Sequence, residues 1–337
     1  MADKPDGERT ISGSLTPGVP FADPSGALRR RLTAGEFAVT AEIGPPRGAD
    51  TAPISRKAAV LRGWVDAVNI TDNQSAAVRL SSLAGSLTAL AVGVEPIMQL
   101  TCRDRNRIAL QSELLSASAL GVPNIVIMTG DHPRHGDHSD ATPVFDLNST
   151  QLLRVAADMR DRGQLMSGAE LKPPPSWFLG AVENPPVRIR DGGMAPDGQD
   201  GFERATHRLA SKIEAGAQFV QTQFVFDVPA FAHWMRRIGD LGLHERCYIL
   251  AGAGPIRSQR ALAHLATIPG VVIPDEVSRR LSSASPERFR AEGEKLCAEI
   301  IAALAEVPGV AGVHVMAIGA ETSIPGILQL AGIPPRS

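Results

Sequence analysis

From residue 28 onward, short apolar runs alternate with longer stretches in which apolar residues recur at helical spacing. The apolar runs are largely unbroken, which is typical of strands buried on both faces of a parallel sheet. The predicted strands are Phe37–Ile43, Ala67–Thr71, Glu95–Leu100, Asn124–Met128, Trp177–Val182, Gln218–Gln223, Cys247–Ala251 and Gly312–Ala317. The predicted helices include Asn106–Leu120, Ser149–Asp161, Gly201–Glu214, Pro229–Leu241, Ser258–Thr267 and Pro286–Glu306. This alternation predicts an α/β fold, a closed (β/α)8 TIM barrel.

Three segments depart from this pattern. Residues 1 to about 26 are rich in Gly, Pro, Ser and Asp and lack periodicity, which predicts a flexible or surface-draped extension. We place this extension at residues 1–30 and a single catalytic barrel at residues 31–335. Pro-rich connections flank the fifth predicted strand, Gly163–Ser176 before it and Pro185–Asp200 after it. The second is long enough to act as a lid or rim.

A doubly wound dinucleotide-binding fold is the structural alternative. That fold needs a G-x-G-x-x-G sequence after its first strand. Here the first strand is followed by Gly44-Pro45-Pro46, and proline has no backbone N–H to offer a pyrophosphate. The barrel is therefore the better interpretation.

Composition excludes several classes of function. The formal net charge of -2 favours neither nucleic acid nor an acidic membrane surface, and 4% aromatic residues are too few for base-stacking platforms. No apolar run reaches transmembrane length, and residues 1–10 carry no signal-peptide core. The cysteines, Cys102, Cys247 and Cys297, are far apart in sequence. We therefore expect a cytoplasmic protein that binds neither membrane nor nucleic acid.

Short polar motifs directly follow six of the predicted strands or overlap their ends. They are Glu42-Ile43-Gly44-Pro45-Pro46, Thr71-Asp72-Asn73-Gln74, Thr101-Cys102-Arg103-Asp104, Thr129-Gly130-Asp131-His132, Glu183-Asn184-Pro185 and Gln221-Thr222-Gln223. A barrel opens the carboxyl ends of all its strands on one face, where active sites lie. The motifs are therefore expected to converge.

Together these motifs resemble the methylenetetrahydrofolate reductase family of flavin-dependent barrel enzymes in one-carbon metabolism. The resemblance covers roughly Ala34–Ile333 and includes Lys212 with Ala215-Gly216-Ala217, and Thr222 to Asp227. Cys102 to Asn106 and Gly312 to Gly319 are similar to the acetogen-type branch. We expect no C-terminal regulatory domain of the animal type.

The resemblance implies a flavin-dependent oxidoreductase that interconverts 5,10-methylenetetrahydrofolate and 5-methyltetrahydrofolate. NAD(P)H would be the electron donor, with ping-pong hydride transfer through flavin N5. FAD is the expected cofactor, with FMN as the alternative, and NADH the expected donor. In one-carbon catabolism the same catalyst would run as a methyl-tetrahydrofolate oxidase. Two alternatives stay open: flavin-free hydride transfer from NADH to the folate, and a partner-dependent subunit. Family membership also implies a homo-oligomer.

Two carboxylates are the expected catalytic groups. Glu42 lies at the end of the first strand among apolar neighbours, and apolar surroundings favour the protonated form of a carboxyl. Such a group suits the acid that protonates the folate. The alternative is a carboxylate in a surface salt bridge at the end of the strand. Asp131 matches a family aspartate near the flavin and the pterin; an Asx turn is the alternative.

The resemblance also assigns binding residues. Lys212 would reach a cofactor phosphate or ribose, unless it is solvated, and Arg103 would clamp an anion or join a rim salt-bridge network. Gln223 would contact the folate, unless it belongs to an internal polar layer. The expected cofactor-binding residues are Thr71, Asn73, Gln99, Thr129, Gly130, Asp131, His132, Val144, Phe145, Ala181 and Lys212, and the expected substrate-binding residues are Glu42, Asp131, Gln223 and Phe224.

The histidines invite a metal interpretation, which the sequence disfavours. His132, His135 and His138 with Asp137 lie in a loop that contains Gly and Pro, not on one helix face, so we expect no metal site. His314 lies inside the last apolar strand, where we expect a satisfied core or barrel-mouth histidine.

Overall fold

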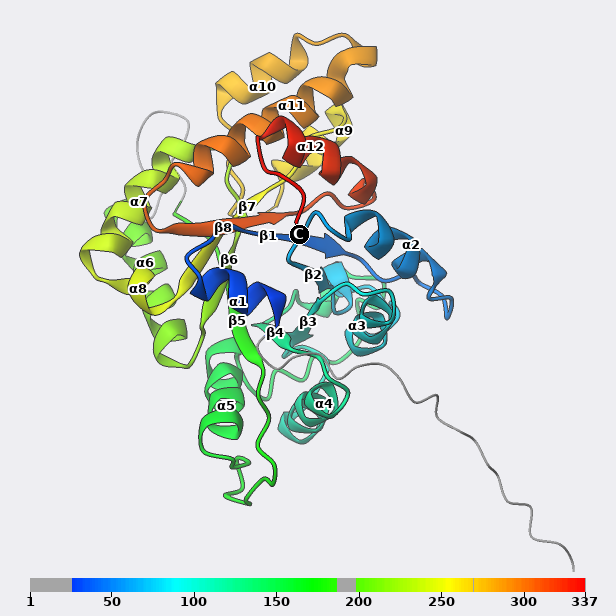
Figure 1. The fold of residues 1–337 in the computed structure, drawn as a ribbon, viewed down its shortest axis with the longest axis vertical. Helices are drawn as coiled ribbons and strands as arrows, with labels where there is room; N and C mark the ends of the chain where they lie inside the picture. Colours follow the sequence, from blue (N-terminus) through cyan, green and yellow to red (C-terminus); the bar gives the residue numbers. More distant parts are fainter. Residues whose placement is uncertain (1–25, 187–197, 269, 337) are drawn as a thin grey trace, which may run out of the picture.

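The computed structural model of the chain describes residues 26–186, 198–268 and 270–336. Parallel strands form one closed barrel in chain order (Figure 1). They are β1 (Ala38–Ile43), β2 (Ala67–Ile70), β3 (Pro96–Thr101), β4 (Asn124–Met128), β5 (Phe178–Glu183), β6 (Phe219–Phe224), β7 (Tyr248–Ala253) and β8 (Val310–Val315). The predicted (β/α)8 fold is confirmed, with strand ends shifted by one or two residues.

Helices surround the barrel. They are α1 (Ala27–Thr33), α2 (Ala52–Leu61), α3 (Ser82–Ala91), α4 (Arg107–Ala119), α5 (Ser149–Asp161), α6 (Gly198–Glu214), α7 (Val228–Asp240), α8 (Leu243–Arg246), α9 (Gln259–Leu265), α10 (Asp275–Ser282), α11 (Pro286–Ala305) and α12 (Ile324–Leu330). Polar caps fix where several begin: Asn106 accepts from the N–H groups of Ile108 and Ala109, and Asn148 forms a capping box with Gln151.

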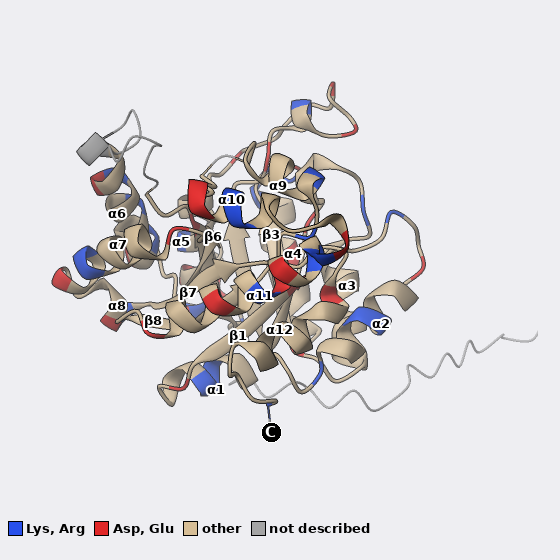
Figure 2. Ribbon diagram, turned by 90° about the horizontal axis from the view of Figure 1, so that it is seen from above, with Lys and Arg blue, Asp and Glu red and all other residues tan. Residues whose placement is uncertain are grey.

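The hydrophobic core has an outer and an inner part. The outer part fills the space between sheet and helices. The inner part fills the lower barrel and joins Leu28 and Leu32 of α1 to inward-facing strand residues such as Phe178 and Phe219. Figure 2 shows α1 beside the C-terminus at one end of the molecule and α9 at the other. Helix α1 therefore closes the amino end of the barrel.

A half-buried carboxylate anchors α1. Glu95, just before β3, accepts from the N–H groups of Ala27 and Leu28 and from the amide of Asn124 at 2.7 Å. Residues 27–30, which the predicted boundary assigned to the extension, thus belong to this helix. The rest of the predicted extension, residues 1–25, lies outside the described residues.

The two Pro-rich connections lie on either side of β5. In the first, Gln164 and Glu170 form an antiparallel bridge. The predicted lid, 185–200, lies outside the described residues from 187 to 197. Within the described ranges, no helix is both long and apolar enough to cross a bilayer.

Candidate active site

A cavity of about 500 Å³ opens at the carboxyl ends of the barrel strands. This volume lies in the range of small-molecule and cofactor sites. The predicted motifs after β1 to β6 all contribute to its wall. Its lining includes Glu42, Asn69, Thr71, Asn73, Gln99, Arg103, Met128, Thr129, Gly130, Asp131, Glu183, Lys212, Gln221, Gln223, Phe224, Ile268, His314, Met316 and Ile318.

A second hollow, of about 650 Å³, lies at the opposite end beside α1. Its buried carboxylates already have structural partners. Asp66 accepts from the N–H of Val39 at 2.7 Å and pairs with Arg31 and Arg336. Because the amino face of a barrel serves stability, we place the chemistry in the smaller cavity.

Most of the predicted site residues reach this cavity, but four do not line it. His132 and Val144 are exposed on the loop after β4, and Phe145 packs against the core with its ring 6.2 Å from that of His132. Ala181 is buried in the outer core. Side chains alternate along a strand, so Val182, which lines the cavity, leaves Ala181 facing the helices.

Glu42 lies in the cavity wall and is only 7% exposed. Its Oε2 accepts a hydrogen bond from Gln99 Nε2 at 3.2 Å, and His314 Nε2 lies 3.9 Å from the same oxygen. No Lys or Arg in the described ranges forms an ion pair with it. Glu42 is therefore a buried carboxyl that faces the cavity, not a strand-end surface salt bridge.

A polar layer crosses the barrel directly below Glu42. His314 Nδ1 lies 3.0 Å from Thr40 Oγ1 and 3.3 Å from Gln221 Nε2. Gln221 and Asn69 exchange amide hydrogen bonds of 3.0 and 2.6 Å. Gln221 Nε2 also donates to Thr40 Oγ1 at 3.1 Å, so Thr40, Asn69, Gln221 and His314 form one connected network.

The part of the wall after β2 and β4 suits a flat polar ring. Thr71 Oγ1 is buried without a hydrogen-bond partner among the described residues, and Thr71 lines the cavity. Gly130 has φ +85°, and a Cβ there would lie 3.0 Å from Thr101. A side chain at Gly130 would be strained and would crowd Thr101, so glycine is required at this point of the cavity lining.

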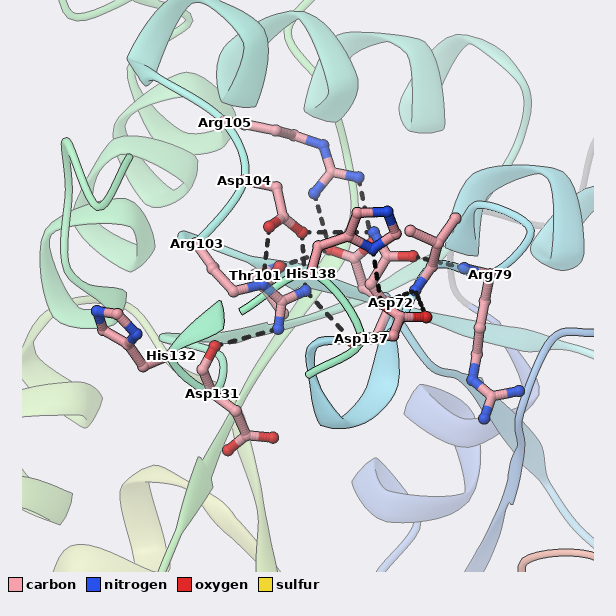
Figure 3. Close-up of polar contacts among 12 residues, drawn as sticks. Asp72, Arg79, Thr101, Arg103, Asp104, Arg105, Asp131, His132, Asp137 and His138 are labelled. Atoms are coloured by element: carbon pink, nitrogen blue, oxygen red, sulfur yellow. Dashed lines mark hydrogen bonds and ion pairs between the residues drawn. The ribbon is translucent and has the colours of Figure 1, made fainter. Parts of the chain in front are cut away.

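Charged groups tie the loops after β2, β3 and β4 together (Figure 3). Asp72 accepts from Thr101 N at 2.9 Å and from Arg105 Nη1 at 2.8 Å. Arg103 donates to Asp104 at 2.7 Å and to the carbonyl of Asp131 at 3.3 Å. Burial opposes ionisation of Asp104, but the hydrogen bonds from Arg103 and Asn73 and the charges of Arg103 and Arg105 together outweigh it and lower the pKa of that carboxyl. Arg103 thus belongs to a rim salt-bridge network.

The same contacts leave the carboxylate of Asp131 available. Figure 3 shows this carboxylate extending away from the charged cluster, while its own carbonyl accepts from Arg103. Asp131 lines the cavity. Its position fits contact with a ligand better than a closed Asx turn.

Lys212 is neither free nor solvated. Its Nζ lies 2.6 Å from Glu183 Oε2 and 2.6 Å from the carbonyl of Val182. Arg208 binds the other oxygen of Glu183 at 2.8 Å. The positive charge of Lys212 is therefore neutralised at the cavity wall.

The histidines after β4 have local partners. His138 Nδ1 lies 3.0 Å from Asp137, which also accepts from the N–H of Val78, and His132 accepts from the N–H of Arg134. In the described part of the chain, no three His, Cys, Asp or Glu side chains gather as a metal site would need. These contacts fold the loop against the loop after β2.

The sequence of the chain matches a known family. Residues 27–332 fit the family model described as methylenetetrahydrofolate reductase. The chain belongs to the methylenetetrahydrofolate reductase family.

Relatives of the chain within this family are much longer. Methylenetetrahydrofolate reductase 2 of Saccharomyces cerevisiae is 26% identical over 262 residues, which cover 76% of this chain and 40% of the yeast protein. Methylenetetrahydrofolate reductase 1 of Schizosaccharomyces pombe is 23% identical over 242 residues, which cover 71% of this chain and 36% of the S. pombe protein. The chain thus spans well under half the length of these relatives.

A solved structure shares the family's barrel fold. An uncharacterized protein from Clostridium thermocellum, described as binding two copies of 5-methyl-5,6,7,8-tetrahydrofolic acid, aligns with a TM-score of 0.60. The alignment covers 90% of this chain and 97% of that one at 14% identity. This likeness supports the fold alone.

Sequence reasoning missed the polar layer of this reductase-family barrel. Thr40 and Asn69 were not singled out, Gln221 was named in a motif without a role, and His314 was not connected to Glu42. A signal was present, because Thr40 precedes Glu42 by two residues and Gln221 precedes Gln223 by two. Residues two apart on a strand face the same side.

Proposed function

We propose that this chain is a methylenetetrahydrofolate reductase barrel that interconverts 5,10-methylenetetrahydrofolate and 5-methyltetrahydrofolate with NAD(P)H. One observation carries the proposal: a buried carboxyl, Glu42, faces a cavity that Asp131, Thr71 and Gly130 also line. Reduction of the methylene bridge requires a protonated nitrogen, and Glu42 is the positioned acid.

A flavin suits the part of the wall after β2 and β4. The unpartnered hydroxyl of Thr71 and the polar backbone at Gly130, which also lines the cavity, fit the polar edge of an isoalloxazine ring. When bound, the flavin would pass a hydride from the nicotinamide to the folate by a ping-pong route. We take FAD as the form, FMN as the alternative, and NADH as the donor.

The remaining groups hold the substrate. Gln99 orients the Glu42 carboxyl through its 3.2 Å hydrogen bond. Asp131 accepts hydrogen bonds from the pterin ring. Gln223 lines the cavity with Phe224, and its amide suits the mixed donor and acceptor edge of a pterin. We further propose a cytoplasmic homo-oligomer in which the same site can run as a methyl-tetrahydrofolate oxidase.

A second candidate is flavin-free hydride transfer from NADH to the folate. The observation that favours it is the pairing of Arg103 and Lys212, the two Lys or Arg residues that the described ranges place in the cavity wall. Lys212 is held by Glu183 at 2.6 Å and Arg103 by Asp104 at 2.7 Å. Neither cation is left to neutralise a flavin pyrophosphate.

The visible spectrum of the purified full chain distinguishes the two candidates. The first predicts flavin absorption that bleaches when NADH is added without oxygen and returns when methylenetetrahydrofolate follows. A colourless protein that takes up neither FAD nor FMN, yet oxidises NADH with the folate, would establish the second. Absence of any NADH–folate reaction would contradict both.

A further inference from the structure

We propose that Arg257, in the loop after β7, binds a carboxylate of the glutamyl part of the folate and so sets the affinity for substrates that carry it. This inference rests on the proposed function. It adds a specificity-determining residue that lies outside the cavity wall.

The position of Arg257 is at the mouth of the cavity. It follows the end of β7 at Ala253, on the catalytic face. Its Nη1 lies 3.5 Å from the carbonyl of Gly319, whose neighbour Ile318 lines the cavity. The loops after β7 and β8 are in close contact, because a Cβ at Gly254 would lie 2.4 Å from the carbonyl of Met316.

The guanidinium of Arg257 is poorly satisfied. Its Nε is buried and has no hydrogen-bond partner within the described ranges. The contact with Gly319 is longer than an ordinary N–H···O hydrogen bond. This long contact is the one hydrogen bond that Arg257 makes within the described ranges, and an arginine carries five N–H donors, so the remaining Nη donors are open to a further acceptor.

Other cations near this rim are already neutralised. Lys57 pairs at 2.7 Å with Glu321, the acid next to the Gly319 loop, and Lys212 pairs with Glu183 at 2.6 Å. No carboxylate in the described part of the chain pairs with Arg257. Its charge is therefore available to an incoming anion.

A folate carries an anion at the required end. With its pterin beside Glu42 and Asp131, its benzoyl and glutamyl parts must leave through the cavity mouth. Ile268, Met316 and Ile318 give one side of the cavity an apolar surface that suits the benzoyl ring. The glutamyl carboxylates beyond that ring then meet Arg257, whose planar fork matches a carboxylate.

The test compares two ligands and two variants of the full chain. Dissociation constants are measured for 5-methyltetrahydrofolate and for an analogue that ends at the aminobenzoyl group. Arg257→Gln should weaken binding of the first about tenfold, as expected for a lost charge-assisted hydrogen bond, and leave the second unchanged. The matched control Arg260→Gln, exposed on α9, should change neither.

The other outcomes are equally decisive. Arg257→Lys should give an intermediate loss for 5-methyltetrahydrofolate alone, which separates charge from folding. Equal losses for both ligands would make Arg257 structural, and weaker NADH binding alone would assign it to a phosphate; each overturns the inference. If the wild-type chain binds neither folate, the proposed function fails as well.

Discussion

At the scale of single residues, the site is built from pairs of side chains on one strand face. Glu42 and Gln223 line the cavity, and Thr40 and Gln221, two residues earlier on the same strands, belong to the polar layer at its floor. His314 lies between the two levels, 3.0 Å from Thr40 Oγ1 and 3.9 Å from Glu42 Oε2. The direct hydrogen bond to Glu42 comes from Gln99.

Replacing the acid should separate the two half-reactions. Glu42→Gln keeps the shape and the hydrogen-bonding capacity of the side chain but cannot donate the proton. Reduction by NADH should stay near wild type, while folate reduction falls about a hundredfold or more. Stopped-flow measurement of each half-reaction checks this, with the exposed Glu306→Gln on the opposite face as control. Folate turnover at the wild-type rate would remove Glu42 from the role of acid.

We expect His314 to act as a positioning residue, because it lies between Thr40 and Glu42. His314→Asn should slow the folate half-reaction about tenfold, the scale on which outer groups that orient a reacting residue act. It should also alter the pH dependence of that half-reaction and leave reduction by NADH unchanged. Thr40→Val should reproduce both effects, and Thr40→Ser, which keeps the hydroxyl, should not. A uniform loss in both half-reactions would instead indicate a folding defect.

At the scale of elements, buried charge fixes the loops that shape the cavity. Asp72, after β2, binds the backbone and hydroxyl of Thr101 in β3 and the guanidinium of Arg105. The loop after β2 has left-handed φ angles at Asn73 and Ser75, which such contacts must hold. The carboxylate therefore sets the relative position of two motifs that line the site.

Breaking this pair should be costly. The Asp72 side chain is fully buried and that of Arg105 is 18% exposed, so Asp72→Asn leaves a largely buried cation without its partner. We expect the free energy of unfolding to fall by about 3 kcal/mol, measured by urea denaturation. Asp146→Asn breaks the exposed pair with Arg107 and should lower the free energy of unfolding far less. Equal effects of the two changes would contradict this account.

At the scale of the whole molecule, the barrel is closed at one end and open at the other. Leu28 and Leu32 of α1 are buried with strand residues from around the barrel. The helix is held by Glu95 and the chain end by Asp66, which binds Arg336 at 3.4 Å. The closed end stabilises the fold, which leaves the open end to the chemistry.

The anchor of α1 should make stability depend on pH. Burial raises the pKa of Glu95 above its ordinary 4.5, and this outweighs the hydrogen bonds from Asn124, Ala27 and Leu28. The folded protein therefore holds this proton more tightly than the unfolded chain. The stability that Glu95 contributes is complete below pH 4.5 and is lost as pH rises through the raised value.

Glu95→Gln tests this dependence because the amide does not titrate. Relative to wild type, the variant should gain unfolding free energy as pH rises from 4.5 toward neutrality, measured by urea unfolding across that range. Glu36→Gln changes an exposed partner of Arg31 on α1 and is the control. The difference in unfolding free energy between this variant and wild type should stay constant over the same pH range. A constant offset between Glu95→Gln and wild type at every pH would contradict the proposed titration.

The sequence by itself determined the barrel, its strand order and the motifs that reach the cavity. These depend on local apolar periodicity and on the rule that strand ends share one face. Only the tertiary structure decided which partner each polar group takes. Lys212 was expected at a phosphate but is bound by Glu183, and Ala181 faces the helices because its neighbour Val182 faces the cavity. The anchoring of α1 by Glu95 joins positions 67 residues apart, a distance over which local patterns carry no information.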